Sequence, residues 1–344
     1  MKLSPDKIQK IAVFRALQLG DLLCTVPAFR ALRNAYPDAE ITLLSLPWAS
    51  EFVKRFSNYF DRFVHFPGYP DLPEQEYNAK ALADFIQKMR DEQFDLLLQM
   101  QGNGTIVNNL LRQFGATCVA GFYNEESFIN SEFFMPYPNY GSEIERHLLL
   151  MQHLGIPSQG TQLEFPLTEK DQKDFDDLLL PIFPKKYVCI HPGSRGAYRQ
   201  MPPQYFAALA DYCIEQEFIV VITGTKSETD ISKEVIKCMK HFAIDVTGKT
   251  SLGAVAILIK NAFALISNCT GVSHIAAAMQ TPSIVISMDG EPERWAPLNK
   301  ELHKVIDWTK NPHFDAALLE TVTLINNKKI ASKNQGQQKD LLLF

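Results

Sequence analysis

Small, hydroxyl-bearing and charged residues gather in four short segments, each of which directly follows an apolar run typical of a buried strand. Backbone amides, hydroxyl groups and arginines in such segments are the groups with which proteins bind phosphate oxygens. The sequence therefore predicts anion binding where these strands end. The four segments are QLGD at 18–21, HPGSRGAYRQMPP at 191–203, TGTKSE at 223–228 and SNCTGVSH at 267–274.

The second segment carries the side chains best suited to a diphosphate. Arg195 and Arg199 can each bind a phosphate through two N–H groups, and Ser194 adds a hydroxyl donor. A solvated surface loop is the alternative interpretation.

The fourth segment precedes a helix rich in small residues. Its first-turn amides and Thr270 could bind an anionic oxygen, with Gly271 allowing a tight turn and His274 lying one turn further on. Ordinary helix capping by Asn268 or Thr270 explains the same residues without a ligand.

Two acidic residues also follow predicted strands. Glu228 could accept hydrogen bonds from a ribose diol, or it could be an ordinary first-turn acid of a helix. Asp21 follows Gly20 at the end of the first predicted strand, where a general base could stand, or it could cap the next helix. Arg15, in that first strand, is expected either to contact an anionic acceptor or to form an internal salt bridge.

Composition limits the remaining possibilities. A net charge of −5 leaves no basic excess for binding nucleic acid. The six cysteines have no CxxC or CxxxC spacing, so no zinc or redox motif is present and no metal site is predicted. The N-terminus has no signal-peptide pattern, and no apolar run approaches the length of a membrane helix. We therefore expect a cytoplasmic protein.

Strands and helices alternate along the 344 residues, in two successive sets. This pattern predicts an α/β protein with two Rossmann-like, doubly wound domains that face a central cleft. We expect the last helix to pack back on the N-terminal domain. The expected divisions are an N-terminal domain at 1–160, an interdomain connection with one helix at 161–185, a C-terminal domain at 186–325 and a flexible tail at 326–344.

Four stretches together resemble the ADP-heptose–lipopolysaccharide heptosyltransferase family, glycosyltransferase family 9. Their order and spacing agree with that family from about residue 9 to about residue 300, and the resemblance implies a GT-B fold. The stretches are FRALQLGDLLCTVPAFRALRNAYPDAEITLL, HPGSRGAYRQMPPQYFAALAD, DVTGKTSLGAVAILI and SNCTGVSHIAAAMQTPSIVI.

The resemblance implies an inverting transfer of a sugar that needs no metal and no cofactor. Asp21 takes the place of the family's catalytic acid, with Gly20 and Arg15 on the acceptor side. Arg199 takes the place of its diphosphate-binding cation and Glu228 that of its ribose-binding acid. The donor would be a nucleotide sugar such as ADP-heptose, and the acceptor an envelope glycolipid or oligosaccharide reached from the cytosolic face of the inner membrane.

Cys269 departs from the family, which usually has aspartate at this position of the donor loop Cys269–His274. If Cys269 acts on the sugar, Cys269→Asp should change the sugar preference. If it is a packing residue, the same change should destabilise the domain.

Two other functions remain open. A nucleotide-sugar epimerase or hydrolase on the same fold would use the same donor, and a catalytically impaired homologue would only bind carbohydrate. Aromatic and basic residues at 50–63 could touch a membrane surface transiently, or they could form an amphipathic helix with a solvated face.

Overall fold

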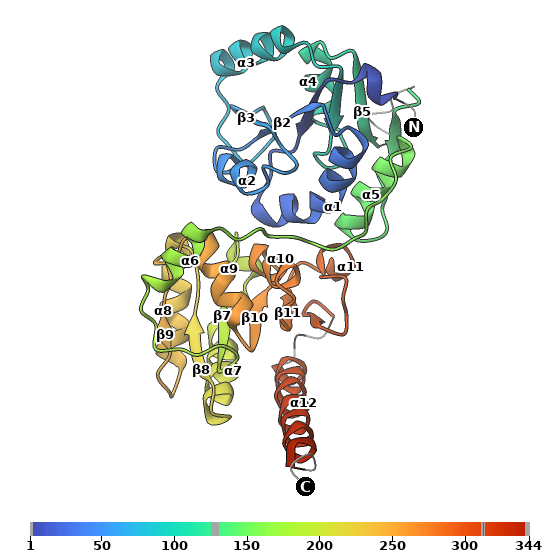
Figure 1. The fold of residues 1–344 in the computed structure, drawn as a ribbon. Coiled ribbons are helices and arrows are strands. Elements are labelled where there is room, and N and C mark those ends of the chain that lie inside the picture. Colours follow the sequence, from blue (N-terminus) through green and yellow to red (C-terminus); the bar gives the residue numbers. More distant parts are fainter. Residues whose placement is uncertain (1–2, 125–130, 311, 313, 341–344) are drawn as a thin grey trace. The chain divides into compact units, whose positions relative to one another are not determined.

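The computed structural model describes residues 3–124, 131–310, 312 and 314–340. The chain divides into two compact units, Met1–Pro166 and Leu167–Phe344 (Figure 1). Each unit contains a six-stranded sheet in which all neighbouring strands run parallel. Parallel neighbours need a crossover connection, which helices supply in both units. The predicted class, two doubly wound α/β sheets, is confirmed.

The N-terminal sheet has the strand order β3-β2-β1-β4-β5-β6, which is the Rossmann order with its switch point between β1 and β4. Its strands are β1 Lys10–Phe14, β2 Glu40–Ser45, β3 Arg62–His65, β4 Leu96–Gln99, β5 Cys118–Tyr123 and β6 Phe134–Pro136. Its helices are α1 Leu19–Ala35, α2 Ala49–Arg55, α3 Ala79–Glu92, α4 Asn108–Leu111 and α5 Glu143–His153, with short 3₁₀ turns at Pro5–Lys7 and Arg112–Phe114.

The C-terminal sheet has the order β12-β11-β10-β7-β8-β9, which repeats the same topology with the switch point between β7 and β10. Its strands are β7 Tyr187–His191, β8 Ile219–Ile222, β9 Ile244–Asp245, β10 Ala264–Asn268, β11 Ser283–Ser287 and β12 His303–Asp307. Its helices are α6 Glu169–Asp176, α7 Pro203–Glu215, α8 Thr229–Cys238, α9 Leu252–Asn261, α10 Gly271–Ala278, α11 Pro292–Trp295 and α12 Phe314–Asp340, with 3₁₀ turns η4 Ala197–Arg199 and η5 Lys226–Glu228.

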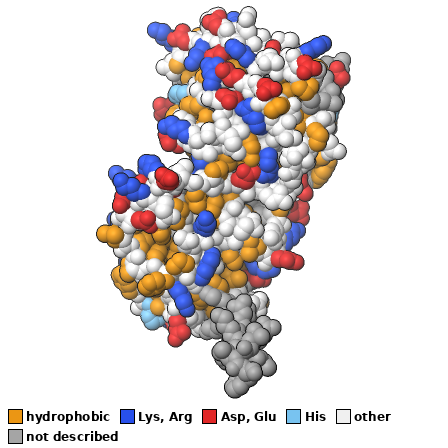
Figure 2. All heavy atoms as spheres, in the orientation of Figure 1, with side chains coloured by type: hydrophobic (Ala, Val, Ile, Leu, Met, Phe, Trp, Pro, Cys, Tyr) orange, Lys and Arg blue, Asp and Glu red, His pale blue; other side chains and the backbone are white. Residues whose placement is uncertain are grey.

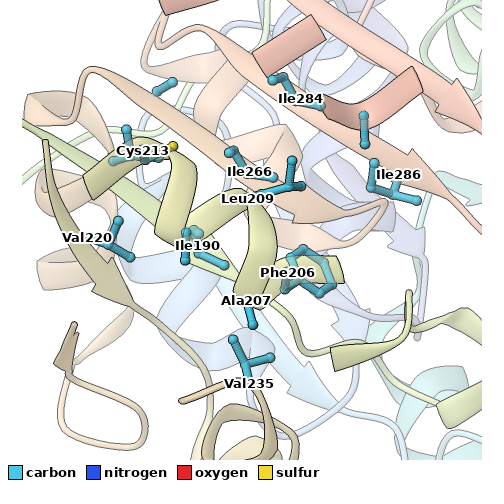
Figure 3. Close-up of a cluster of buried hydrophobic side chains, with 14 of the residues drawn as sticks. Ile190, Phe206, Ala207, Leu209, Cys213, Val220, Val235, Ile266, Ile284 and Ile286 are labelled. Carbon is cyan, nitrogen blue, oxygen red and sulfur yellow. The ribbon is translucent and has the colours of Figure 1, made fainter. Parts of the chain in front are cut away.

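The central strands are continuous apolar runs because helices cover both faces of each sheet. In β1, the residues Ile11–Phe14 have no exposed surface, and Ile11 is paired with Ile41 of β2 and Leu96 of β4. In the C-terminal unit, Phe206 of α7 lies in one buried cluster with the sheet residues Ile190 and Ile266 (Figure 3). These buried strands fix where the polar loops begin.

Four of the six cysteines are buried. Cys213 of α7 lies in the same cluster, and burial raises the pKa of its thiol to about 12. Cys24, Cys189 and Cys269 are also buried, whereas Cys118 is partly exposed and Cys238 is exposed.

The segment between the two sheets contains the expected helix, α6. Thr168 and Asp171 form a capping box at its start, with the Asp171 carboxylate accepting from the Thr168 amide at 2.8 Å. Helix α6 packs on α9 so closely that a Cβ atom on Gly253 would lie 1.6 Å from Asp171 Oδ1. The missing side chain of Gly253 therefore lets α6 dock on the C-terminal unit.

Helix α12 continues through Asp340, beyond the point where the sequence predicts a flexible tail. It contacts α7, β11 and β12 of its own unit. The mobility of 326–344 and the packing of this helix on the N-terminal unit stay predictions, and residues 341–344 lie outside the described part of the chain.

Replacing Gly253 by alanine should destabilise the C-terminal unit, because the added methyl group overlaps the Asp171 side chain. We expect a loss of about 1–3 kcal/mol in the free energy of unfolding, measured by urea titration. The double variant Gly253→Ala/Asp171→Ala is the control. It should lose less than the sum of the two single variants, and simple additivity would contradict the close contact.

Candidate active site

Three of the four predicted loops meet at one edge of the C-terminal sheet. They follow β7, β8 and β10, which are neighbours in the order β10-β7-β8. The strands are in register, with Ile190 of β7 paired with both Ile266 and Ile222. The carboxyl ends of parallel strands at a switch point are where doubly wound sheets bind their ligands.

Asn268, the last residue of β10, fastens the loop after β7 to this edge. Its Oδ1 accepts a hydrogen bond from the Met201 amide at 3.0 Å, and its Nδ2 donates to the Pro192 carbonyl at 2.7 Å. Both ends of the arginine-bearing loop are therefore held by one buried amide side chain. Asn268 does not cap α10. That position belongs to Thr270, whose side chain makes no cap hydrogen bond.

Arg199 forms an ion pair with Asp289, which lies just beyond β11. The other Asp289 oxygen, Oδ1, accepts from the Ser287 hydroxyl at 2.9 Å. Of the remaining residues of this loop, Arg195 is exposed and Ser194 is buried, with its carbonyl accepting from Gln200 Nε2 at 3.0 Å. Sequence reasoning missed Asp289, because nothing in the sequence links it to a cation ninety positions away.

Glu228 closes a capping box on Thr225, whose amide and hydroxyl donate to Glu228 Oε2 at 2.7 and 2.8 Å. The same oxygen lies 3.6 Å from His191 Nε2. Burial disfavours the charged carboxylate, but His191 and the Thr225 donors outweigh it and lower the pKa of Glu228 to about 2. Gly193 is required here, since a Cβ atom would lie 2.2 Å from Glu228 Oε1. The first-turn interpretation is confirmed, and the ribose role stays a prediction.

Cys269 is only 5% exposed, and its thiol donates to the Trp295 carbonyl at 3.7 Å. Burial raises the pKa of this thiol to about 12, with a further contribution from Asp289 that Arg199 opposes. The thiol is therefore neutral at physiological pH, and the lowering of a cysteine pKa that helix N-termini can produce does not occur here.

The start of α10 differs in detail from the expectation. Gly271 opens the helix without a positive φ, so the turn does not depend on the conformational freedom of glycine. The Ser273 hydroxyl donates back to the Thr270 carbonyl at 2.7 Å. His274 is buried within the helix, and its contact with a phosphate stays a prediction.

The first predicted loop, QLGD at 18–21, lies in the N-terminal unit, after β1. Asp21 is the third residue of α1 and forms a capping box with Gln18, whose amide donates to Asp21 Oδ2 at 3.2 Å. The Asp21 side chain is 22% exposed to solvent, and Gly20 is also partly exposed. The capping interpretation is confirmed, and it leaves part of the carboxylate open to solvent.

Arg15 follows β1 directly and is completely buried. Its Nε donates to the Asp21 carbonyl at 3.1 Å, and its Nη1 donates to the Met100 carbonyl. Its Nη2 lies 3.1 Å from Glu143 Oε1 and 4.0 Å from Asp21 Oδ1. The expected internal salt bridge is therefore confirmed, and a contact between Arg15 and the acceptor stays a prediction.

Glu143, at the first position of α5, is the second buried charge in this network. Its Oε1 is 3.3 Å from His147 Nε2, and its Oε2 accepts from the Tyr137 hydroxyl at 3.3 Å. Arg146 Nη1 lies 4.0 Å from the same carboxylate. The sequence shows Glu143 only as an ordinary acid in the first turn of a helix.

The aromatic residues of the stretch 50–63 are mostly buried, and a transient membrane contact of this stretch stays a prediction. Phe52, Phe56 and Phe60 are buried, and Arg62 is paired with Glu40 and Glu92. Figure 2 shows positive and negative side chains interspersed over the visible face of both units.

In the part of the chain that the structure describes, no helix is long and apolar enough to cross a membrane. Nor do the described residues contain a group of three or more His, Cys, Asp or Glu side chains that could hold a metal ion.

Known proteins resemble this chain over nearly its whole length. The model of glycosyltransferase family 9 (heptosyltransferase) matches residues 82–320. The lipopolysaccharide core heptosyltransferase OpsX of Haemophilus influenzae is 22% identical, over 100% of both chains. The lipooligosaccharide heptosyltransferase 2 of Haemophilus ducreyi is 29% identical, over 85% of this chain and 87% of the relative.

A solved structure shares the fold. The Escherichia coli ADP-heptose lipopolysaccharide heptosyltransferase II superposes with a TM-score of 0.73 at 16% identity, over 94% of this chain and 100% of that one. The predicted GT-B fold is thereby confirmed.

The burial of Cys269 yields a prediction for Cys269→Asp. A carboxylate there would be buried beside Asp289, and we expect a loss of about 3–5 kcal/mol in the free energy of unfolding at pH 7. A buried carboxyl has a raised pKa, so the loss should appear only above the unfolded-state pKa and be smaller at pH 4. Urea unfolding at both pH values measures this.

Cys269→Ser, which adds no charge, is the matched control and should lose much less stability. A stable Cys269→Asp variant with a changed sugar preference would show instead that this position contacts the donor sugar.

Proposed function

We propose that this protein transfers a heptose from ADP-heptose to a lipopolysaccharide core oligosaccharide. The proposal starts from the fact that the chain belongs to glycosyltransferase family 9 and is a glycosyltransferase. The family match, which extends over parts of both units, carries the proposal. The names of the relatives, which are lipopolysaccharide and lipooligosaccharide heptosyltransferases, support the choice of sugar and acceptor.

The donor would bind at the carboxyl edge of the C-terminal sheet. Arg199, on the loop that Asn268 holds, would bind the diphosphate together with Ser194, Arg195 and the amides at the start of α10. Glu228, ionised because its pKa is low, would accept hydrogen bonds from the ribose hydroxyls. The arginine charge would stabilise the negative charge that develops on the leaving ADP.

Transfer would be an inverting single displacement. The acceptor hydroxyl oxygen bonds to the anomeric carbon while the bond from that carbon to the diphosphate oxygen breaks. Asp21 takes the hydroxyl proton, and ADP leaves with the electron pair. The hydrogen bond from the Gln18 backbone amide orients the Asp21 carboxylate. Arg15 donates to the Asp21 backbone carbonyl and so holds the turn that carries this carboxylate.

We include two further points about the reaction in the same proposal: transfer needs no metal and no cofactor. We also propose that the protein is cytoplasmic and contacts the inner membrane transiently. Arginines and helix amides would take over the charge stabilisation that a metal supplies in other transferases. The family match favours sugar transfer over the epimerase, hydrolase and binding-only alternatives.

Asp21→Asn should abolish heptose transfer while leaving ADP affinity nearly unchanged, because asparagine cannot accept the proton. Transfer to purified lipopolysaccharide core and ADP binding by calorimetry measure the two effects, with excess chelator in a parallel series. Asp38→Asn, which changes an exposed acid outside α1, is the control and should retain full activity.

Near-normal turnover of Asp21→Asn would exclude Asp21 as the base. Activity lost in chelator and restored by Mg²⁺ would contradict metal independence. Release of free sugar by the wild-type protein without acceptor would favour the hydrolase, and donor binding without any turnover would favour the impaired homologue.

Glu228→Gln should weaken ADP binding by about 1.5–3 kcal/mol, the range for a hydrogen bond to a charged group. The loss should be smaller for 2′-deoxy-ADP, which lacks one of the ribose hydroxyls. Glu234→Gln, an exposed change on α8, is the control. Equal losses for the two nucleotides would mean that Glu228 acts only through the Thr225 turn.

A further inference from the structure

Asp289 is held on both of its carboxylate oxygens. Oδ1 accepts from the Ser287 hydroxyl at 2.9 Å and from the Glu291 amide at 3.3 Å. Oδ2 takes the ion pair with Arg199 Nη2. Ser287 is itself completely buried at the end of β11. The carboxylate is therefore oriented by the sheet edge before it meets the arginine.

Arg199 has much less support of its own. It is the last residue of η4, a single 3₁₀ turn within a loop of eleven residues between β7 and α7. Its side chain is 27% exposed, against 15% for Asp289. Of the two partners, the carboxylate is thus the fixed one, and it determines where the guanidinium lies.

The ion pair leaves the arginine able to bind another anion. A guanidinium carries five N–H donors in a planar fork, and the recorded contact with Asp289 uses only Nη2. The Cys269 amide, in the loop before α10, donates to the Ile286 carbonyl of β11 at 2.8 Å. The loop that bears Asp289 therefore leaves β11 beside the start of α10, whose amides are the other donors proposed for the diphosphate.

We infer that Asp289 is a positioning residue for donor binding, which fixes the guanidinium of Arg199 so that its remaining N–H groups face the diphosphate. This inference rests on the proposed function, because it takes Arg199 as a ligand of the diphosphate. Asp289 itself touches neither the diphosphate nor the reacting atoms.

A carboxylate beside an anion site has two opposing effects. It orients the arginine, which strengthens binding, and it repels the diphosphate, which weakens binding. Positioning acts only through Arg199, whereas repulsion persists when Arg199 is removed. A double-mutant cycle on Asp289 and Arg199 therefore separates the two effects.

The experiment measures the Kd of ADP by calorimetry for the wild type, Asp289→Asn, Arg199→Ala and the double variant. We expect Asp289→Asn alone to weaken ADP binding about tenfold, within the usual range of coupling between contacting residues. In the Arg199→Ala background, the same change should leave the Kd unchanged or lower it. Turnover should show a higher KM for ADP-heptose with an unchanged KM for the acceptor.

Two further variants keep the result interpretable. Ser287→Ala removes one hydrogen bond from the Asp289 carboxylate and should weaken ADP binding by a smaller factor in the same direction, which serves if Asp289→Asn does not fold. Asp307→Asn is the matched control. Asp307 lies at the end of the neighbouring strand β12 and accepts from the Thr309 hydroxyl at 2.6 Å, so its loss should leave the Kd of ADP unchanged.

Two outcomes for Asp289→Asn would overturn the inference. One is that Asp289→Asn leaves the Kd of ADP unchanged or lowers it while Arg199 is present. The other is that Asp289→Asn weakens ADP binding in the Arg199→Ala background by the same factor as in the wild type. If either outcome is found and the wild type binds ADP and transfers heptose, the proposed function stands and only the positioning role of Asp289 is excluded. If the wild type binds no ADP, the donor proposal fails and the inference fails with it.

Discussion

A guanidinium without any exposed surface must find all its partners inside the protein, and Arg15 imposes this constraint on the N-terminal unit. Its charge faces Glu143, and its N–H groups reach the Asp21 and Met100 carbonyls. One side chain therefore joins the ends of β1 and β4 to the starts of α1 and α5. The turn that presents Asp21 depends on these contacts, because moving any of the elements would leave a buried charge unsatisfied.

The C-terminal unit also has a buried polar side chain that holds its loops, but this side chain is neutral. Asn268, also without exposed surface, satisfies its amide group on the Pro192 carbonyl and the Met201 amide, and so fixes the loop that carries Arg199. Both units thus place a buried polar side chain where a central strand ends next to the switch point. At that position the neighbouring loops diverge, and backbone groups are available to bond with a side chain.

Electrostatics divides the C-terminal loops into charged and neutral positions. Glu228 is ionised because His191 and the Thr225 donors outweigh the cost of burial, whereas Cys269 keeps its proton because burial and Asp289 both oppose a thiolate. The negative charge beside Arg199 comes from Asp289, on the loop after β11, and not from the loop before α10. Position 269, which departs from the family pattern, is therefore buried and neutral.

The sequence by itself was sufficient for the class of fold, the positions of the polar loops and the family. Apolar runs and helical periodicity are local properties, and buried parallel strands express them strongly. The short strands β6 and β12 lie at sheet edges and lack such runs, so local patterns do not indicate them. Only the tertiary structure decided that Arg15 is internal, that Cys269 is buried, and that Asp289 pairs with Arg199 and Glu143 with Arg15. Each of these depends on a partner far along the chain, as with Arg15 and Glu143, which are 128 positions apart. Charge, burial and pKa are set by such partners, and the spacing of residues within one segment carries no information about them.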